Sequence, residues 1–227
     1  MAHRKSNFIH KSWAVFRKDI QLEFRTRYVI NAILMFALTV LTAVSFSIGP
    51  LRLRVEIGAA LLWIILFFSA MSGLAHIFVR EEEQQTADTL RLFSRPVNIF
   101  LGKWFFNLLL LYSLEIIIVP LYFVFLNVPD PVLSIFLPVL FLGSFALASA
   151  STLIGAIISQ ASARGALFAV LTFPIVLPVM FSGIHGTQLS FARASFLDCL
   201  SDLQVLLSFS VVILTGSVLL FEFVWRK

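Results

Sequence analysis

Charged residues are scarce in this sequence of 227 residues. Asp, Glu, Lys and Arg together make up 13% of the chain, whereas 59% is hydrophobic and phenylalanine alone occurs 25 times. Soluble domains carry about 25% charged residues, so this chain has too little charge to cover a surface that faces water. The composition therefore excludes a soluble globular protein and predicts an integral membrane protein.

Cysteine and histidine are also too few to support metal or disulfide chemistry. Cys199 is the one cysteine, so the chain can form no internal disulfide and no cysteine-based zinc site. The four histidines form no H-E-x-x-H motif and no pair spaced four residues apart. We therefore predict no bound metal and no cofactor held directly by the chain.

Nucleotide-binding and catalytic motifs are missing. The one Gly-Lys pair, Gly102-Lys103, has Val97 where a P-loop requires its first glycine and is followed by Trp104. Ser182 precedes a glycine, but Met180 stands where a serine hydrolase motif has glycine. The chain is predicted not to be an enzyme, and any ATP that it uses must be bound by another subunit.

Long apolar stretches make up most of the sequence. Each is close to the roughly 20 residues with which a helix spans a bilayer, and only short connections separate them. We predict an all-α membrane protein with a cytoplasmic N-terminal segment, 1–28, and a six-helix permease domain, 29–227. The predicted spans are 29–48, 57–79, 104–126, 132–158, 166–182 and 203–225.

Basic residues are distributed unevenly between the two sides of these spans. If the N-terminus is cytoplasmic, the cytoplasmic segments hold 14 of the 17 Lys and Arg residues and the outer segments hold three. The positive-inside rule then predicts that both termini face the cytoplasm. The positive net charge is thereby assigned to membrane topology, and no nucleic-acid partner is predicted.

The N-terminal segment has a helical pattern of aromatic residues. Trp13, Phe16, Ile20 and Phe24 recur every three or four residues, which predicts an amphipathic helix lying in the membrane interface. Anchoring to lipid and docking of a cytoplasmic partner are both compatible with this pattern. The polar face is predicted to carry Lys11, Arg17, Lys18, Asp19, Gln21 and Arg25.

Few ionisable or amide side chains fall within the spans. Glu115 lies twelve residues into the third span, Asn107 lies two turns before it, and His76 lies near the cytoplasmic end of the second span. An ionisable group at this depth is a functional candidate, and Glu115 supports the alternative of an ATP-independent secondary carrier. A hydrogen-bonded role between helices is equally compatible with it.

Two further regions have a distinct composition. The fourth span is rich in Gly, Ala and Ser, which predicts close helix packing. Residues 181–186 are expected to break the fifth helix, so that 183–202 forms a partly interfacial or re-entrant segment. Its polar residues, His185, Arg193, Asp198 and Asp202, are candidates for contact with a partner on the outer side.

Residues 80–96 form the longest charged connection after the N-terminus. Its acidic start and basic end match a helix dipole, and Pro96 is expected to stop the helix. The segment is either a solvated helix on the lipid headgroups or a coupling helix that enters a groove of an ATPase. The coupling residues would be Glu81, Glu82, Glu83, Asp88, Leu90, Arg91 and Arg95.

This region resembles the CcmB permease family of cytochrome c maturation ABC transporters. The resemblance rests on the stretch from His76 to Glu82, on Thr89 to Leu92, on Pro96 and on Ile99 to Trp104, and it extends to Ser47–Pro50 and the six-span plan. It implies a membrane domain like those of ABC-2 or type V exporters. The same features in looser form leave a general ABC-2 exporter of a drug, lipid or glycan as an alternative.

The resemblance also implies partners and a location. The family's permease pairs with the ATPase CcmA, associates with CcmC and CcmD, and acts indirectly on the haem chaperone CcmE. Two permease copies per complex and a bacterial inner membrane, rather than a mitochondrial one, are expected, with haem as the group handled. The tryptophans of this chain are scattered at positions 13, 63, 104 and 225, which favours mechanical coupling over haem binding.

Overall fold

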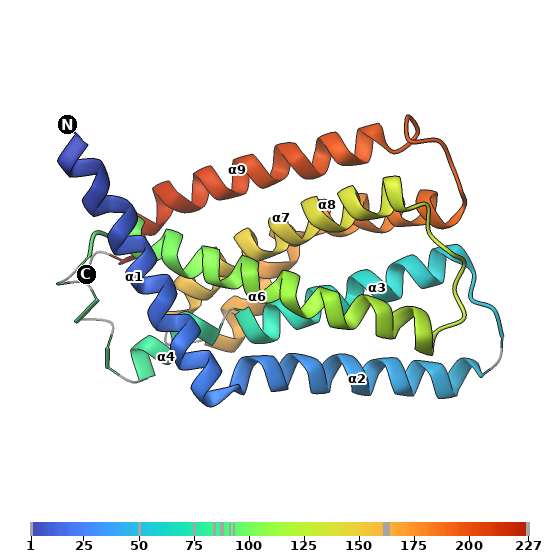
Figure 1. Ribbon diagram of the computed structural model, residues 1–227, viewed down its shortest axis with the longest axis horizontal. Coiled ribbons are helices and arrows are strands. Elements are labelled where there is room, and N and C mark those ends of the chain that lie inside the picture. The colour runs from blue at the N-terminus through green and yellow to red at the C-terminus, as the bar shows by residue number, and fades with distance from the viewer. Residues whose placement is uncertain are drawn as a thin grey trace.

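In the computed structural model all regular secondary structure in the described part of the chain is helical. The described part comprises residues 2–49, 51–74, 76–83, 85–86, 89–90, 92, 94–160 and 164–225. Helices α2, α3, α6, α7, α8 and α9 run along the long axis, and α1 crosses one end of the bundle (Figure 1). The elements are α1 (Ala2–Thr26), α2 (Tyr28–Ile48), α3 (Val55–Ser69), the π-helix η1 (Ala70–Leu74), α4 (His76–Glu83), α6 (Pro96–Phe125), α7 (Leu133–Ser159), α8 (Arg164–Phe191) and α9 (Leu200–Trp225).

Four helices in the described residues, α2, α6, α7 and α9, are long and apolar enough to cross a membrane, and α3 is a shorter apolar helix. Large apolar side chains on these helices point outward, among them Phe46, Ile116, Val124 and Phe223. Such exposure is unfavourable in water but suits contact with lipid. The prediction of an all-α membrane protein is thus confirmed.

The centre of the bundle is α7, which packs against α4, α6, α8 and α9. From Gly143 to Gly155 most of its residues are Gly, Ala, Ser or Thr, and nearly all of them are buried. Small side chains allow the neighbouring backbones to come close, which is how membrane helices gain packing energy without a hydrophobic driving force. The predicted packing role of this segment is confirmed.

Trp63 of α3 fills the space between α7 and α8. Its side chain is fully buried, and its indole Nε1 donates a hydrogen bond to Thr187 Oγ1 of α8 at 2.9 Å. A Cβ on Gly143 would lie 2.0 Å from the indole, and one on Gly183 would lie 2.5 Å from it. The two glycines therefore form the faces between which the indole lies.

This packing overturns one prediction. Residues 181–186 do not break the fifth helix, because α8 continues through them to Phe191, and only residues 192–199 form turns before α9 begins. Gly183 makes room for Trp63, and Gly186 packs close to Val139, so both glycines serve helix contacts. The segment 183–202 is accordingly a helix end and a turn, and it is not re-entrant.

Helix α1 has a buried face that differs from the predicted one. Phe16 is buried against α6, but Trp13 and Phe24 are 55% and 70% exposed. Asp19, predicted on the polar solvent face, is buried, as is Glu23. Asp19 lies three residues after Phe16 and Glu23 lies seven after it, so helical spacing places all three on one face. The two carboxylates can be buried because each lies close to a basic side chain: Asp19 to Lys103 and Glu23 to Arg80.

Candidate functional site

The second apolar helix does not end as a regular α-helix. After α3 the chain forms the π-turn η1 and then α4, which carries the acidic residues of the charged connection. A Cβ on Gly73, within η1, would lie 2.2 Å from Ile33 Cδ1 of α2, so the π-turn packs directly on that helix. Single π-turns within helices are frequent at functional sites.

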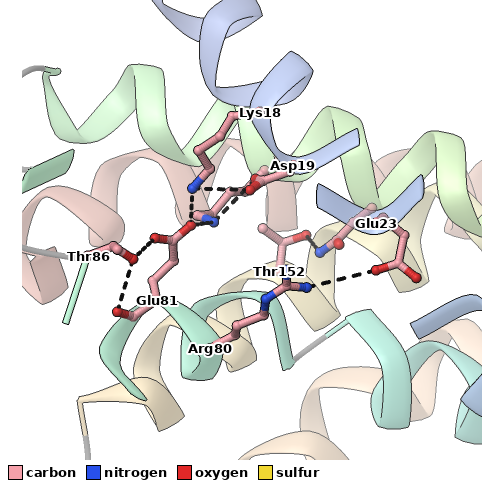
Figure 2. A network of polar contacts seen from close by, with 9 residues as sticks. Lys18, Asp19, Glu23, Arg80, Glu81, Thr86 and Thr152 are labelled. Atoms are coloured by element: carbon pink, nitrogen blue, oxygen red, sulfur yellow. Dashed lines mark hydrogen bonds and ion pairs between the residues drawn. The ribbon is translucent and has the colours of Figure 1, made fainter. Parts of the chain in front are cut away.

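A group of four charged side chains, three of them buried and one partly exposed, joins α1, α4 and α6 at the end of the bundle where both termini lie (Figures 1 and 2). We call Lys18, Asp19, Glu81 and Lys103 the charge cluster. Lys103 Nζ lies 2.9 Å from Glu81 Oε1 and 3.2 Å from Asp19 Oδ2, and its side chain is fully buried. Lys18 pairs with Glu81 and, at 3.3 Å, with Asp19 Oδ1. Two cations and two anions leave the cluster electrically balanced, which is the condition for burying them.

Gly102 explains how α1 comes close enough to complete the charge cluster. A Cβ at this position would lie 2.7 Å from the Ser12 carbonyl oxygen and 2.8 Å from Val15 Cβ, so only glycine lets α1 pack on α6 here. The next residue, Lys103, then reaches both α1 and α4, and its ammonium lies 5.3 Å from the centre of the Phe78 ring. Gly102 thus serves helix packing, and Lys103 serves the ion pairs of the charge cluster.

A second set of contacts fixes the bend between α1 and α2. Glu23 Oε1 accepts a hydrogen bond from the backbone N–H of Ile30 at 3.0 Å, in the first turn of α2. Arg27, between the helices, has a left-handed φ of 51°. Glu23 also lies 4.0 Å from Arg80 of α4. One buried carboxylate therefore caps α2, whose N-terminal amides lack helical partners, and links it to α4.

Glu81 is the centre of the charge cluster. Burial acts to raise the pKa of its carboxyl, but the ammonium groups of Lys103 and Lys18, with hydrogen bonds from Lys18 and Thr86, outweigh burial and lower the pKa from 4.5 to about 2. Thr86 Oγ1 donates to Glu81 Oε2 at 2.5 Å, and the Thr86 N–H donates to the Glu81 carbonyl at 3.0 Å. The chain after α4 is thus tied to the cluster.

The lowered pKa of Glu81 predicts acid sensitivity. A carboxylate with a depressed pKa stabilises the fold above its ordinary pKa of 4.5, and this contribution is lost as the pH falls towards about 2. We expect the thermal unfolding midpoint of the protein in detergent to fall over this range. The variant Glu81→Gln should be less stable at neutral pH and should show a flatter pH profile. A wild-type profile in the variant would contradict this assignment.

The remaining residues predicted for coupling lie in different surroundings. Glu82 Oε1 accepts a hydrogen bond from Gln160 Nε2 at 2.5 Å, which joins α4 to the end of α7. Glu83 and Arg95 are exposed, and Leu90 is half-buried against the cluster of Phe78, Phe100 and Trp225. Asp88 and Arg91 lie outside the described residues.

Pro96 marks the boundary between the charged connection and α6, because residues 94 and 95 before it are not helical. Pro96 is the first residue of α6, where its fixed φ favours helix initiation and its missing N–H costs nothing. On the other side, α4 ends at Glu83 and Gln85 has a left-handed φ of 55°. The described part of 80–96 therefore comprises α4, a second helical stretch that includes residues 89, 90 and 92, and the first residue of α6, and it is not one continuous helix.

The two intramembrane candidates whose side chains are described, Asn107 and Glu115, both lie on α6, further along the chain than Lys103. Asn107 Nδ2 donates to Thr152 Oγ1 of α7 at 2.9 Å, deep in the bundle. Glu115, two helical turns further along α6, is buried beside an apolar groove of about 480 Å³ between α6 and α7. His76 begins α4, but its side chain lies outside the described residues.

At the opposite end of the bundle two of the four predicted residues meet. His185 Nδ1 of α8 lies 2.8 Å from Asp202 Oδ2 of α9. Asp198 Oδ2 instead accepts a hydrogen bond from the Ser195 N–H within the turn, and Arg193 is exposed with a left-handed φ of 56°. The structure thus pairs His185 with Asp202 and leaves Arg193 and Asp198 in the connection.

Sequence reasoning missed three of the buried charges. Lys103 was considered only as part of the Gly-Lys pair, Asp19 was placed on the polar face of the N-terminal helix, and Glu23 was given no role. The available signal was the helical spacing of Asp19 and Glu23 on the same face as Phe16. Carboxylates on an apolar face predict buried cationic partners, because an unpaired buried charge is too costly.

Comparison with known proteins identifies the family of this chain. A family described as CcmB protein matches residues 10–224, which is nearly the whole chain. A curated relative, Heme exporter protein B from Bradyrhizobium diazoefficiens, is 26% identical over 178 residues, covering 77% of this chain and 80% of the relative. The family match includes α1, α4 and α6, which carry the charge cluster. The chain therefore belongs to the CcmB family.

Proposed function

We propose that this chain is the membrane permease subunit of an ABC transporter for cytochrome c maturation, and that haem is the group handled. A separate CcmA-type ATPase supplies the energy, and CcmC, CcmD and, indirectly, the chaperone CcmE are the further partners. Membership of the CcmB family and the name of the curated relative, a heme exporter protein, support this assignment.

The proposed topology has six crossings with both termini in the cytoplasm. The crossings are α2, α3 with η1, α6, α7, α8 and α9, with α1 in the interface of an inner bacterial membrane. The excess of Lys and Arg on one side supports this orientation. The exposed rings of Trp13 and Phe24 on α1 support contact of that helix with lipid.

The observation that carries the mechanism is the charge cluster. It links the connection after α4 to α1 and α6 through ion pairs that no solvent shields. A displacement of α4 by an ATPase would therefore move α6, because separating these charges would leave them buried and unpaired. The chain thus acts by mechanical coupling, with Glu81 as the joint between the cytoplasmic connection and the spans.

Leu92 is the candidate contact with the ATPase. It is 86% exposed and lies in the chain between α4 and α6. We expect Leu92→Asp to reduce co-purification with the ATPase about tenfold or more, since burying an unpaired carboxylate in an apolar contact costs more than the roughly 1.4 kcal/mol that corresponds to tenfold. Leu51→Asp, an equally drastic change of an exposed leucine between α2 and α3, is the matched control and should pair normally. Equal pairing by both variants would exclude Leu92 from the interface.

Complementation tests the function itself. The chain and its ATPase are expressed in a bacterium that lacks its own CcmB, and covalent haem in c-type cytochromes is stained. We expect staining to return and to be lost with a hydrolysis-dead ATPase. Absent staining despite correct insertion and ATPase pairing would favour a general ABC-2 exporter. Failure to pair with any ATPase would favour a carrier that depends on Glu115.

A further inference from the structure

His185 and Asp202 form a pair at the end of the bundle remote from the termini, where α8 connects to α9 (Figure 1). The side chain of His185 is 58% exposed, whereas that of Asp202 is 11% exposed. The carboxylate is therefore held within the protein, and the imidazole projects from it towards the surface. The charge cluster, at the other end, does not involve either residue.

The pair fixes which nitrogen of His185 is available. A carboxylate can only accept, so in the neutral ring Nδ1 carries the proton that is donated to Asp202. The lone pair of Nε2 then points away from Asp202, and Nε2 makes no hydrogen bond to any residue in the described ranges. A histidine whose second nitrogen is bound to a carboxylate is the usual arrangement of a metal-ligating imidazole, because the carboxylate orients the ring and raises its basicity.

The residues around His185 favour iron in a porphyrin over a free metal ion. Across the described residues no group of three or more His, Cys, Asp or Glu side chains is placed to hold a free metal ion. Iron in a porphyrin already has four nitrogen ligands and needs only one protein side chain. Phe181, an exposed aromatic residue suited to contact with a porphyrin face, lies one helical turn before His185 on α8, and the connection from α8 to α9 carries two further exposed apolar residues, Phe196 and Leu197.

We propose that His185 Nε2 is an axial ligand for haem iron at this end of the bundle, with Asp202 holding the imidazole in the ligating tautomer. The proposal rests on the proposed function, which supplies haem as the group handled. It adds haem binding to the proposed mechanical coupling, whereas the sequence alone favoured coupling without haem binding. The scattered tryptophans do not form a haem-binding segment, but a single oriented histidine can bind haem iron without such a segment.

Haemin titration of the purified full-length chain in nanodiscs tests the proposal. Binding is followed by the Soret band, and metal-free protoporphyrin IX serves as the matched probe, since it has the same ring and propionates but no iron. We expect Asp202→Asn to weaken haemin binding about 10–100-fold and His185→Ala to weaken it at least as much. Binding of protoporphyrin should change little in either variant. His10→Ala, which removes an exposed histidine near the termini, is the control.

Replacement by another iron ligand gives a positive test. His185→Met should restore haemin binding with a different spectrum and a more positive reduction potential, because a thioether donates less electron density than an imidazole. A His185→Ala protein with the wild-type affinity and Soret band would overturn the proposal. If the His185→Ala protein also restored c-type cytochromes in the complementation test, the proposed function would stand and only the ligand role would fail. If the wild-type chain itself did not restore c-type cytochromes, the proposed function would be refuted.

Discussion

Lys103→Met is expected to destabilise the protein by about 3–5 kcal/mol, which is the usual effect of removing one partner from a buried ion pair. Methionine has nearly the same length and volume as lysine, so packing is largely kept. Asp19 and Glu81 would remain buried, with only the partly exposed Lys18 to balance them. Thermal unfolding in detergent measures the loss.

Two companion variants separate charge from packing. Lys18→Met should cost far less, about 1 kcal/mol or below, because its side chain is 40% exposed. The triple variant Asp19→Asn, Glu81→Gln, Lys103→Met removes the charges together and should recover most of the stability. If coupling runs through the ion pairs, this triple variant should insert and bind the ATPase but fail to restore c-type cytochromes. A fully stable Lys103→Met protein would show that the ammonium is not paired as described.

Trp63→Ala is expected to cause a loss of similar size. Truncating a large buried aromatic costs about 3–5 kcal/mol, since the surrounding helices fill the cavity only in part. Here the indole lies between Gly143 and Gly183, whose lack of side chains leaves nothing to collapse into the space, and its hydrogen bond to Thr187 is also lost. The thermal unfolding midpoint should fall accordingly.

The exposed tryptophan of α1 is the matched control for this effect. Trp13→Ala removes the same atoms from a surface position and should leave the unfolding midpoint almost unchanged. Trp63→Phe should lie between the two, since it keeps an aromatic ring but gives up the hydrogen bond. Equal midpoints for Trp63→Ala and Trp13→Ala would contradict the packing of α3 between α7 and α8.

The sequence was most informative where local composition decides structure. Apolar runs predicted the positions of the long helices, and the small residues of α7 predicted its central packing. The prediction for α8 failed because the role of Gly183 depends on Trp63, which lies 120 positions earlier in the chain. No local pattern distinguishes a glycine that ends a helix from one that faces a distant indole.

The candidate site was predictable in part. The acidic run beginning at Glu81 was identified from its charge pattern, and Glu81 does lie in the charge cluster. The partners of Glu81 in the cluster come from α1 and α6. A single sequence does not show that residues as far apart as Asp19, Glu81 and Lys103 are in contact. His185 and Asp202 were both candidates, but their pairing became visible only because α8 extends further than predicted.

The chain order of the charge cluster bears on how the protein is made. Lys103 is the eighth residue of α6 and is fully buried, so it would enter the membrane as a costly lone cation. Asp19 and Glu81 both precede it in the chain, and synthesis proceeds from the N-terminus. Asp19 and Glu81 are thus already synthesised when α6 leaves the ribosome. The two carboxylates can therefore neutralise Lys103 as soon as this helix is inserted. Helix α9, which follows later in the chain, then places Phe221 and Trp225 against Phe78, which also contacts Lys103, and covers that end of the bundle.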